Sequence, residues 1–259
     1  MAKQPSLKNQ FKVFETVDDL AKAAAADFAQ QAKKAILERG CFRVLLSGGN
    51  TPNKLFEALC RPEIRSGIPW EKVEVFWGDE RCVAHEDPRS NFYVAQRNFL
   101  SKVPILKEHI YPIPTHEKDP EQSAKAYEAC LKQAFQTGPG EVPCFDLVYL
   151  GMGDDGHTAS LFPHTHLVEE VVKGKRPDQW VAASWVPKVH MHRVTLLPLV
   201  LNHARHVSML VSGADKAAVL KAVVHGTSDP MSYPCQLIVP EKNPLVWYLD
   251  KAASTQVCD

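Results

Sequence analysis

The chain has 259 residues, of which 45% are hydrophobic and 23% are charged, a composition typical of globular proteins. Its 30 Lys and Arg residues balance its 30 Asp and Glu residues, so the formal net charge is zero. A chain without net charge has no overall field to attract nucleic acid or an anionic membrane, so any anion must be bound by a local cluster. We therefore expect neither nucleic acid nor a membrane as a partner.

Targeting signals and structural disulfides are not expected either. No apolar run approaches the roughly 18 residues that a membrane span needs, and the N-terminus lacks the apolar core of a signal peptide. The seven cysteines are odd in number and form no CxxC pair, which indicates reduced thiols. These features predict a cytoplasmic protein. Residues 1–11 are expected to be a flexible lead-in to one domain over 12–252, and residues 253–259 to be a C-terminal tail.

Helical and apolar patterns alternate along the chain. A helix is predicted over 17–39, with Asp18 or Asp19 as its N-cap and Gly40 as its end. Further strands are predicted at 42–47, 73–77, 145–150, 180–185, 193–197 and 206–212, and further helices at 52–60, 91–101, 120–136 and 215–224. This alternation predicts a single-domain α/β fold of the Rossmann-like type, with a mostly parallel sheet and helices on both faces.

Ligands of such folds bind beyond the carboxyl ends of the strands. Four of the predicted strand ends carry polar or Gly-rich segments, at 47–52, 78–81, 151–163 and 212–216. The functional residues are therefore expected in these four segments.

Residues 151–163, GMGDDGHTASLFP, follow a predicted strand and contain the spacing GxGxxG from Gly151 to Gly156. That spacing matches a dinucleotide fingerprint. Asp154 and Asp155 oppose this interpretation, because a pyrophosphate is bound by backbone N–H groups and a helix dipole without added negative charge. We therefore expect no dinucleotide here.

His157, in the same loop and near an expected helix start, is a candidate general base. Asp155 can orient an imidazole and stabilise its cation. The alternative is structural: Asp154 and Asp155 cap the following helix, and His157 lies at the surface. The loop residues by themselves leave both interpretations open.

Two other loops can bind an anion. In SGGNTP, residues 47–52, the glycines allow a phosphate to approach the backbone and the helix start offers free N–H groups, although an ordinary turn is equally consistent. Arg81 in the segment 78–81 can bind a phosphate or carboxylate bidentately, or form an ion pair within its loop. Arg193 and Lys216 become candidates only if the fold brings them to the first loop.

Two further patterns carry little weight. The pairs His164-x-His166 and His190-x-His192 resemble metal ligands, but they lack partner carboxylates or cysteines at helix spacing, so no catalytic metal is expected. Ser160 is not part of a GxSxG elbow, which argues against a serine-nucleophile hydrolase.

Taken together, these blocks resemble the 6-phosphogluconolactonase family over about residues 12–250. The resemblance is carried by LSGGNTP at 46–52, WGDERCV at 77–83, Ser90-Asn91, LGMGDDGHTASLFP at 150–163, RVTL at 193–196 and SGADKAAVL at 212–220. Asn50 stands where many members have serine, and it keeps a hydrogen-bonding side chain.

The resemblance implies a single-domain α/β fold shared with glucosamine-6-phosphate deaminase and ribose-5-phosphate isomerase. It implies hydrolysis of 6-phospho-D-glucono-1,5-lactone to 6-phosphogluconate, the second step of the oxidative pentose phosphate pathway, by a monomer without a metal or organic cofactor. His157 would activate water and then protonate the departing ring oxygen, Asp155 would support His157, and Arg81 would stabilise developing negative charge. The phosphate group would be bound by Gly48, Gly49, Asn50, Thr51, Arg193 and Lys216, and Asp79, Glu80 and Gly156 would complete the active-site loops.

Two other functions fit the same type of fold. A glucosamine-6-phosphate deaminase has an Ile-Ala-Phe-Asn-Glu-Pro type of run after its histidine, whose glutamate assists ring opening, whereas residues 158–163 contain no acid. Deaminases also carry tyrosine where this chain has Arg81. A non-catalytic regulator that binds sugar phosphates often has a helix-turn-helix segment or a basic patch, and the sequence contains neither.

Overall fold

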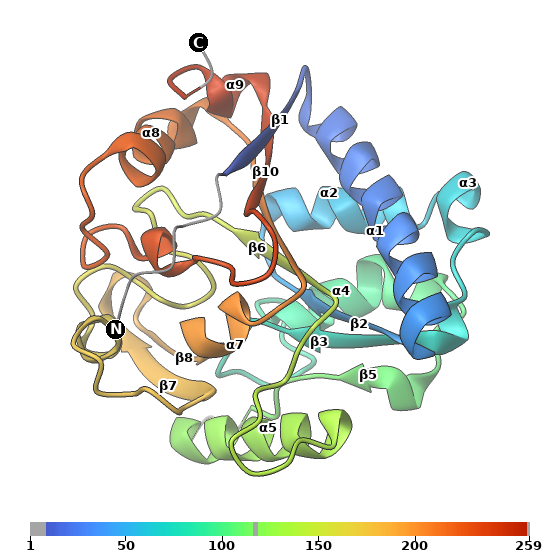
Figure 1. Ribbon diagram of the computed structural model, residues 1–259, viewed down its shortest axis with the longest axis horizontal. Coiled ribbons are helices and arrows are strands. Elements are labelled where there is room, and N and C mark those ends of the chain that lie inside the picture. The colour runs from blue at the N-terminus through green and yellow to red at the C-terminus, as the bar shows by residue number, and fades with distance from the viewer. Residues whose placement is uncertain (1–8, 116–118, 258–259) are drawn as a thin grey trace.

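The main sheet has seven parallel strands in a computed structural model that describes residues 9–115 and 119–257. The strand order is β1-β10-β9-β6-β2-β3-β5, and the sheet runs through the middle of the molecule (Figure 1). The strands are β1 (Gln10–Phe14), β2 (Phe42–Leu46), β3 (Val73–Trp77), β5 (Ile110–Tyr111), β6 (Leu147–Gly151), β9 (His206–Val211) and β10 (Val246–Asp250). The central strands β2, β6 and β9 are apolar along most of their length, because helices or loops cover both of their faces.

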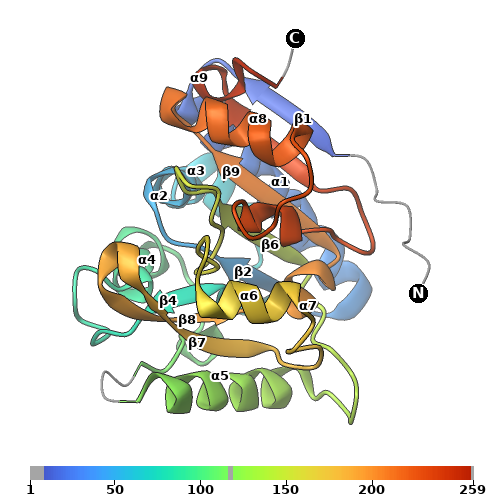
Figure 2. The same ribbon diagram turned by 90° about the vertical axis from the view of Figure 1, so that its left-hand side faces the viewer.

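A second, antiparallel sheet has three strands in the order β4-β8-β7. They are β4 (Asp79–Arg81), β7 (Val181–Val186) and β8 (Met191–Leu196), and helix α5 (Pro120–Phe135) packs against β7 and β8 (Figure 2). The sequence predicts β7 and β8 as strands but does not predict that they form a separate sheet. The short 3-10 turn between them, Pro187–Val189, leaves room for an antiparallel hairpin and not for the crossover of a parallel pair.

The remaining α-helices surround the main sheet. They are α1 (Val17–Arg39), α2 (Asn50–Leu59), α3 (Pro62–Arg65), α4 (Asn91–Asn98), α6 (His166–Val172), α7 (Pro198–Asn202), α8 (Ala217–His225) and α9 (Lys251–Ser254). Helix α1 packs against β2, β10 and α2, and Figure 1 shows α1 and α8 on opposite sides of β10. The predicted single-domain α/β fold with a mostly parallel sheet is confirmed.

Helix α1 has the predicted bounds but a different N-cap. The Thr16 side chain accepts a hydrogen bond from the Asp19 backbone N–H at 3.1 Å and donates to the Asp19 carboxylate at 2.7 Å. Thr16 is thus the N-cap and Asp19 lies inside the first turn of the helix, so the expectation that Asp18 or Asp19 is the cap is wrong. Gly40 ends the helix as predicted, in the left-handed conformation with φ +84°.

Regular elements extend into both of the expected terminal segments. Strand β1 begins at Gln10, inside the expected lead-in 1–11, and pairs with β10. Residues 1–8 lie outside the described part of the chain. Helix α9 extends into the expected tail 253–259, and its Ala253 is fully buried. In the described ranges no helix is both long and apolar enough to cross a membrane.

The candidate site lies at the point in the main sheet where the strand order reverses. From β2 the chain continues to β3 on one side, whereas β6 lies on the other side of β2 and leads to β9 and β10. The loops after Leu46 and Gly151 therefore diverge at the carboxyl ends of two adjacent strands, which creates the crevice where parallel α/β sheets bind ligands.

Candidate active site

A cavity of about 350 Å³ lies at this crevice. It brings together all four polar strand ends singled out in the sequence. Its lining consists of Ser47, Gly48, Gly49, Asn50, Thr51, Pro52, Asp79, Arg81, Asn91, Gly151, Met152, Gly153, His157, Ala159, Ser160, Phe162, Arg193, Leu210, Ser212, Asp215 and Lys216. Of the residues expected in the site, Asp155, Glu80 and Gly156 are not part of this lining.

The loop between β2 and α2 forms one wall. Gly49 is the N-cap of α2 with φ +114°, a conformation that favours glycine, and in the described part of the chain no side chain caps this helix. A Cβ atom on Gly48 would lie 1.8 Å from Asn91 Oδ1, so only glycine fits there. The first N–H groups of α2 are thus left available to an anion in the cavity.

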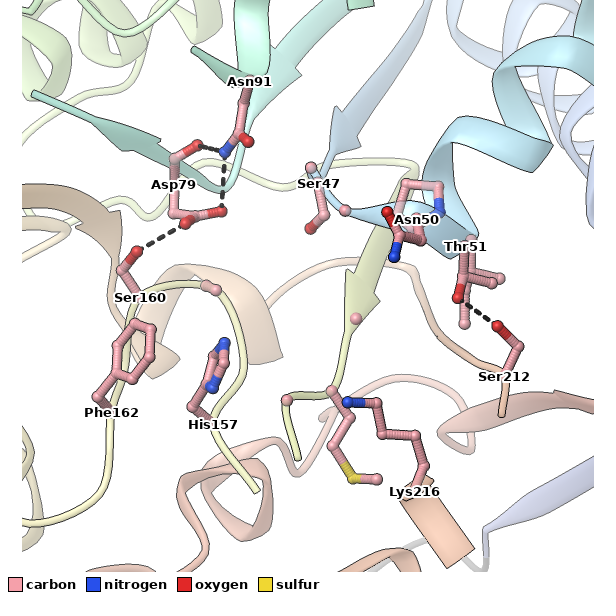
Figure 3. A pocket seen from close by; sticks show the side chains of 18 of the residues that line it. Ser47, Asn50, Thr51, Asp79, Asn91, His157, Ser160, Phe162, Ser212 and Lys216 are labelled. Atoms are coloured by element: carbon pink, nitrogen blue, oxygen red, sulfur yellow. Dashed lines mark hydrogen bonds between the residues drawn. The ribbon is translucent and has the colours of Figure 1, made fainter. Parts of the chain in front are cut away.

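The loop after β9 lies beside the start of α2. The Thr51 and Ser212 hydroxyls are 2.7 Å apart and hydrogen-bonded. Lys216 is largely buried and pairs with Asp215 at 3.1 Å. Figure 3 shows Asn50 and Thr51 on one side of the cavity and His157 and Phe162 on the other, with the Lys216 side chain extending between them.

His157 is held in one orientation. Its Nδ1 lies 2.6 Å from Asp155 Oδ1, and its backbone N–H donates to the same oxygen at 3.1 Å. Its ring stacks on Phe162 with a centroid distance of 3.9 Å. An imidazole that donates its Nδ1–H to a carboxylate keeps the Nε2 lone pair free to accept a proton.

Asp155 is shared between His157 and a residue that the sequence analysis missed. Lys188, in the turn between β7 and β8, donates to Asp155 Oδ2 at 2.8 Å and to Asp154 Oδ1 at 2.6 Å. Burial alone would raise the pKa of Asp155, but hydrogen bonds and charge from His157 and Lys188 outweigh it and hold that pKa well below its usual range. No sequence motif could have identified Lys188, because only the hairpin brings it to Asp155.

The loop itself is not the start of a helix. In the described ranges the next helix, α6, begins at His166 and is capped by Thr165, so the alternative in which Asp154 and Asp155 cap a helix is wrong. Residues Thr158 and Leu161 form an isolated bridge instead. Gly156 supports the turn with φ +79°, and its Cβ position would be 2.9 Å from the Tyr233 ring. A dinucleotide fingerprint requires a helix immediately after its glycines, which is missing here.

The two acids of strand β4, Asp79 and Glu80, point in different directions and have different partners. Asp79 faces the cavity, where it accepts from the Ser160 hydroxyl at 2.6 Å and its backbone carbonyl accepts from the Asn91 amide at 2.9 Å. Glu80 points into the protein and accepts four hydrogen bonds, from the N–H groups of residues 81, 91 and 92 and from the Ser90 hydroxyl. Burial raises the pKa of Glu80, whereas these bonds lower it, with burial the larger effect. Glu80 therefore anchors α4 and does not line the site.

Arg81 and Arg193 are directly opposite each other in the β4–β8 pairing, and both line the cavity. Like charges at directly opposed positions are unfavourable, so the pair indicates an anion site. Arg193 is 8% exposed, burial lowers its pKa, and its Nε has no hydrogen-bond partner within the described residues. Arg81 donates from Nη1 to the Arg89 carbonyl, which orients its guanidinium.

Metal-ligating residues do not gather in this part of the protein. Among residues 9–115 and 119–257, no three His, Cys, Asp or Glu side chains form a group that could hold a metal ion. The histidines of both pairs, His164/His166 and His190/His192, are solvent-exposed.

The fold and the cavity define a class: single-domain α/β proteins with an acid-supported histidine and a cluster of basic groups at the switch point of a parallel sheet. A family model described as glucosamine-6-phosphate isomerases/6-phosphogluconolactonase matches residues 15–247. The chain belongs to this family.

Individual relatives agree with this assignment. A Synechocystis protein named 6-phosphogluconolactonase is 43% identical over 224 residues, which cover 85% of this chain and 86% of that protein. Among solved structures, one titled devB protein is 31% identical with a TM-score of 0.83, covering 96% of this chain and 100% of that one. The 6-phosphogluconolactonase of Trypanosoma cruzi is 25% identical with a TM-score of 0.82, covering 99% of this chain and 100% of that one.

Proposed function

We propose that this protein hydrolyses 6-phospho-D-glucono-1,5-lactone to 6-phosphogluconate in the oxidative pentose phosphate pathway. The observation that carries the proposal is His157, held by Asp155, in the lining of a cavity that also contains Arg81, Arg193 and Lys216. Family membership and the names of the relatives support the same reaction.

The substrate would lie across the cavity with its two ends bound differently. Its phosphate group is placed at the start of α2, where backbone N–H groups of residues 48–51 and the cations of Arg193 and Lys216 balance its charge. The lactone ring then extends toward His157, on the opposite side of the cavity in Figure 3. This arrangement predicts that a lactone without phosphate is a poor substrate.

In the proposed reaction, Nε2 of His157 removes a proton from water as the water oxygen attacks the lactone carbonyl carbon. The carbonyl oxygen gains negative charge, which Arg81 stabilises, and Asp155 stabilises the imidazolium. When the ring C–O bond breaks, the imidazolium returns its proton to the departing ring oxygen. One water is consumed, one ester bond is broken, and His157 ends in its original neutral form.

We further propose that the enzyme is a monomer, that it is cytoplasmic and that it needs no cofactor. Gel filtration and cell fractionation test the first two statements. Dialysis against a chelator, followed by an unchanged rate of lactone hydrolysis, tests the third.

Proton release after adding the protein to freshly generated 6-phosphogluconolactone is the direct test. The rate is compared with spontaneous hydrolysis, with the unphosphorylated lactone and with a His157→Ala variant. We expect rapid hydrolysis of the phosphorylated lactone only, with a loss of about 10²–10⁴-fold in the variant. Activity within about tenfold of the parent would refute the role of His157 as general base.

The same assay separates the other functions of this fold. Ammonium release from glucosamine 6-phosphate would identify a deaminase. Binding of 6-phosphogluconate without any acceleration of lactone hydrolysis would identify a regulator.

A further inference from the structure

Asp79 is a buried acid in the lining of the candidate active site, and no step of the proposed reaction uses it. Its exposed fraction is 7%, and it lies in β4, directly beyond the carboxyl end of β3. In the described part of the chain no lysine or arginine lies within ion-pair distance of its carboxylate. A buried carboxylate without a counter-ion needs hydrogen-bond donors, and a ligand in the cavity can supply them.

The protein supplies only part of the hydrogen bonds that this carboxylate can accept. Ser160 Oγ donates to Asp79 Oδ2 at 2.6 Å. The side-chain nitrogen of Asn91 is 3.5 Å from Oδ1, at the limit of a hydrogen bond. A carboxylate has about four acceptor positions, so Asp79 retains the capacity to accept from a bound molecule.

Asn91 fixes the position of Asp79. The same side-chain nitrogen donates to the Asp79 backbone carbonyl at 2.9 Å, and the backbone N–H of Asn91 donates to Glu80 at 2.7 Å. The Asn91 Oδ1 atom fills the space beside Gly48, where a Cβ atom would be only 1.8 Å away. Asn91 therefore holds the carboxylate at a set distance from the loop between β2 and α2, which makes it a positioning residue.

The charges of the cavity determine which part of a ligand Asp79 can contact. A carboxylate repels phosphate oxygens, which are accommodated instead by the basic side chains of the lining. Burial lowers the pKa of Arg193 and the charge of Asp79 opposes this from beyond ion-pair distance, so the two side chains do not satisfy each other by direct contact. The ligand group that suits Asp79 is a neutral donor, and the hydroxyl groups of a sugar ring are such donors.

We propose that Asp79 accepts a hydrogen bond from the hydroxyl group on C2 of the lactone ring, next to the carbonyl carbon, and thereby determines which sugar-phosphate lactones are hydrolysed. This inference rests on the proposed function, in which the carbonyl carbon lies at His157. Ser160, the partner of Asp79, follows His157 by three residues in the same loop. Figure 3 shows Asp79 and Ser160 on the same side of the cavity as His157, away from Thr51. The hydroxyl group nearest to the carbonyl carbon is therefore the one that faces Asp79.

This contact orients the ring for the reaction. The phosphate group fixes one end of the substrate, and the hydrogen bond to Asp79 prevents the ring from rotating about that end. The carbonyl carbon is then held toward the water that His157 activates. A lactone without the C2 hydroxyl group leaves the buried carboxylate without its donor, so it is bound and oriented less well.

The test compares the hydrolysis of 6-phosphogluconolactone with that of its 2-deoxy analogue, both freshly generated, with the spontaneous rates subtracted. We expect kcat/KM of the parent protein to be about 10- to 100-fold higher for the lactone with the C2 hydroxyl group, because its loss leaves a buried charged group unsatisfied. Asp79→Asn is expected to lower kcat/KM for this lactone and to bring the two values within about threefold, since an amide binds a hydroxyl group less strongly than a carboxylate does.

Two further variants separate contact with the ligand from a structural role. Asp215→Asn removes an exposed acid of the same lining, which pairs with Lys216, and it should keep the preference of the parent protein. Ser160→Ala removes a donor to Asp79 but not its charge, and the preference should be at least as large as in the parent. A structural role of Asp79 would lower the rates with both lactones equally in Asp79→Asn. An unchanged ratio in that variant, or a preference lost in Ser160→Ala, would overturn the proposal.

The parent protein alone distinguishes this inference from the proposed function. Equal acceleration of both lactones would overturn the role of Asp79 and would still establish lactone hydrolysis. If neither lactone were hydrolysed faster than it is spontaneously, the proposed function would fail and this inference with it.

Discussion

At the scale of single residues, the candidate site depends on how the Asp155 carboxylate is shared between a histidine and a lysine. Asp155 Oδ1 faces His157 and Oδ2 faces Lys188, at 2.6 Å and 2.8 Å. Its depressed pKa means that Asp155 releases its proton more readily in the folded chain than in the unfolded one. The stabilisation that follows is present above the ordinary carboxyl pKa, about 3.9, and is lost only as the pH falls through the lower folded value. Asp155 is therefore ionised wherever the enzyme is expected to work.

Asp155→Asn tests the contribution of that charge. We expect kcat to fall at least about 10²-fold with little change in KM, because the imidazolium loses its stabilising partner and its fixed orientation. Initial rates of proton release measure both constants. Asp154→Asn is the matched control, since Asp154 also pairs with Lys188 but does not contact His157 in the structure, and its rate should stay within about threefold of the parent.

Lys188→Gln tests the contribution of the lysine charge beside Asp155. The hydrogen bonds that Lys188 donates to Asp154 and Asp155 raise the pKa of Lys188, so it carries its charge throughout the neutral range. Without that charge the Asp155 carboxylate attracts a proton on His157 more strongly, and the base is lost at a higher pH. We expect the acid limb of the kcat/KM profile to move upward by about half a pH unit to one unit. An unmoved limb, or an equal movement in Lys132→Gln on the distant helix α5, would contradict this role.

At the scale of elements, the loop after β6 holds the His157 ring close to the backbone of the same loop at Gly153. A Cβ atom on Gly153 would lie 2.0 Å from His157 Nδ1 and 2.8 Å from Asp155 Oδ1. Both contacts are far shorter than van der Waals distances, so any side chain at this position separates the acid from the base. Gly153 is required for close approach and not for an unusual φ angle.

Gly153→Ala is therefore expected to reduce kcat about 10²-fold, because displacement of a catalytic group by about 1 Å has effects of that size. Gly151→Ala is the control, since Gly151 also lines the cavity but its Cβ position has no atom within 4 Å. The kcat values of both variants test this expectation, and circular dichroism verifies that both variants fold. Similar losses in the two variants would show that a methyl group in the cavity, and not displacement of His157, lowers activity.

Glu80 links β4 to α4, and its substitution tests stability. In Glu80→Gln the amide keeps one acceptor oxygen and brings an NH₂ group toward hydrogen-bond donors. We expect the free energy of unfolding in urea to fall by about 2–4 kcal/mol, since buried donors lose their acceptor. The exposed Glu57→Gln in α2 should change it by less than about 0.5 kcal/mol.

The sequence predicts those helices and strands that are long enough to show a periodic pattern of apolar residues. Helix α1 and the strands β2, β3 and β6 were located within a few residues, whereas β4 and β5, of three and two residues, are too short for any periodicity. Strand β1 lies at the sheet edge, and its residues alternate between polar and apolar only from Gln10 to Val13, which is too short a pattern to distinguish a strand from a terminal lead-in. Short elements are specified by their partners in the fold, and a single sequence does not show those partners.

The same limit applies to the site. His157, Asp155 and the glycines stand close together in one loop, so a local motif identifies them. Lys188 and the opposition of Arg81 to Arg193 depend on a hairpin and on strand register, which join positions far apart in the chain. The sequence placed Glu80 in the active-site loops, whereas the structure buries its side chain, because spacing along a strand does not reveal which face is inside.

At the scale of the whole molecule, the cavity joins the two halves of the sheet. The start of α2 comes from one side of the switch point, and Lys216 comes from the segment after β9 on the other side. A phosphate group bound by both halves would bind the folded chain and not the unfolded one. Ligand binding of this kind raises the free energy of unfolding by RT ln(1 + [L]/Kd).

The product 6-phosphogluconate should therefore raise Tm without any chemistry. At about 100 times Kd the stabilisation is about 2.7 kcal/mol, which corresponds to about 5 °C for a chain of this length. We expect Lys216→Ala to abolish most of this shift and His157→Ala to retain it, because in the proposed orientation Lys216 binds the phosphate and His157 acts only as the base. Gluconate without phosphate serves as the control ligand. If His157→Ala abolished the shift and Lys216→Ala did not, the phosphate would have to lie on the histidine side of the cavity, and the proposed orientation of the substrate would be reversed.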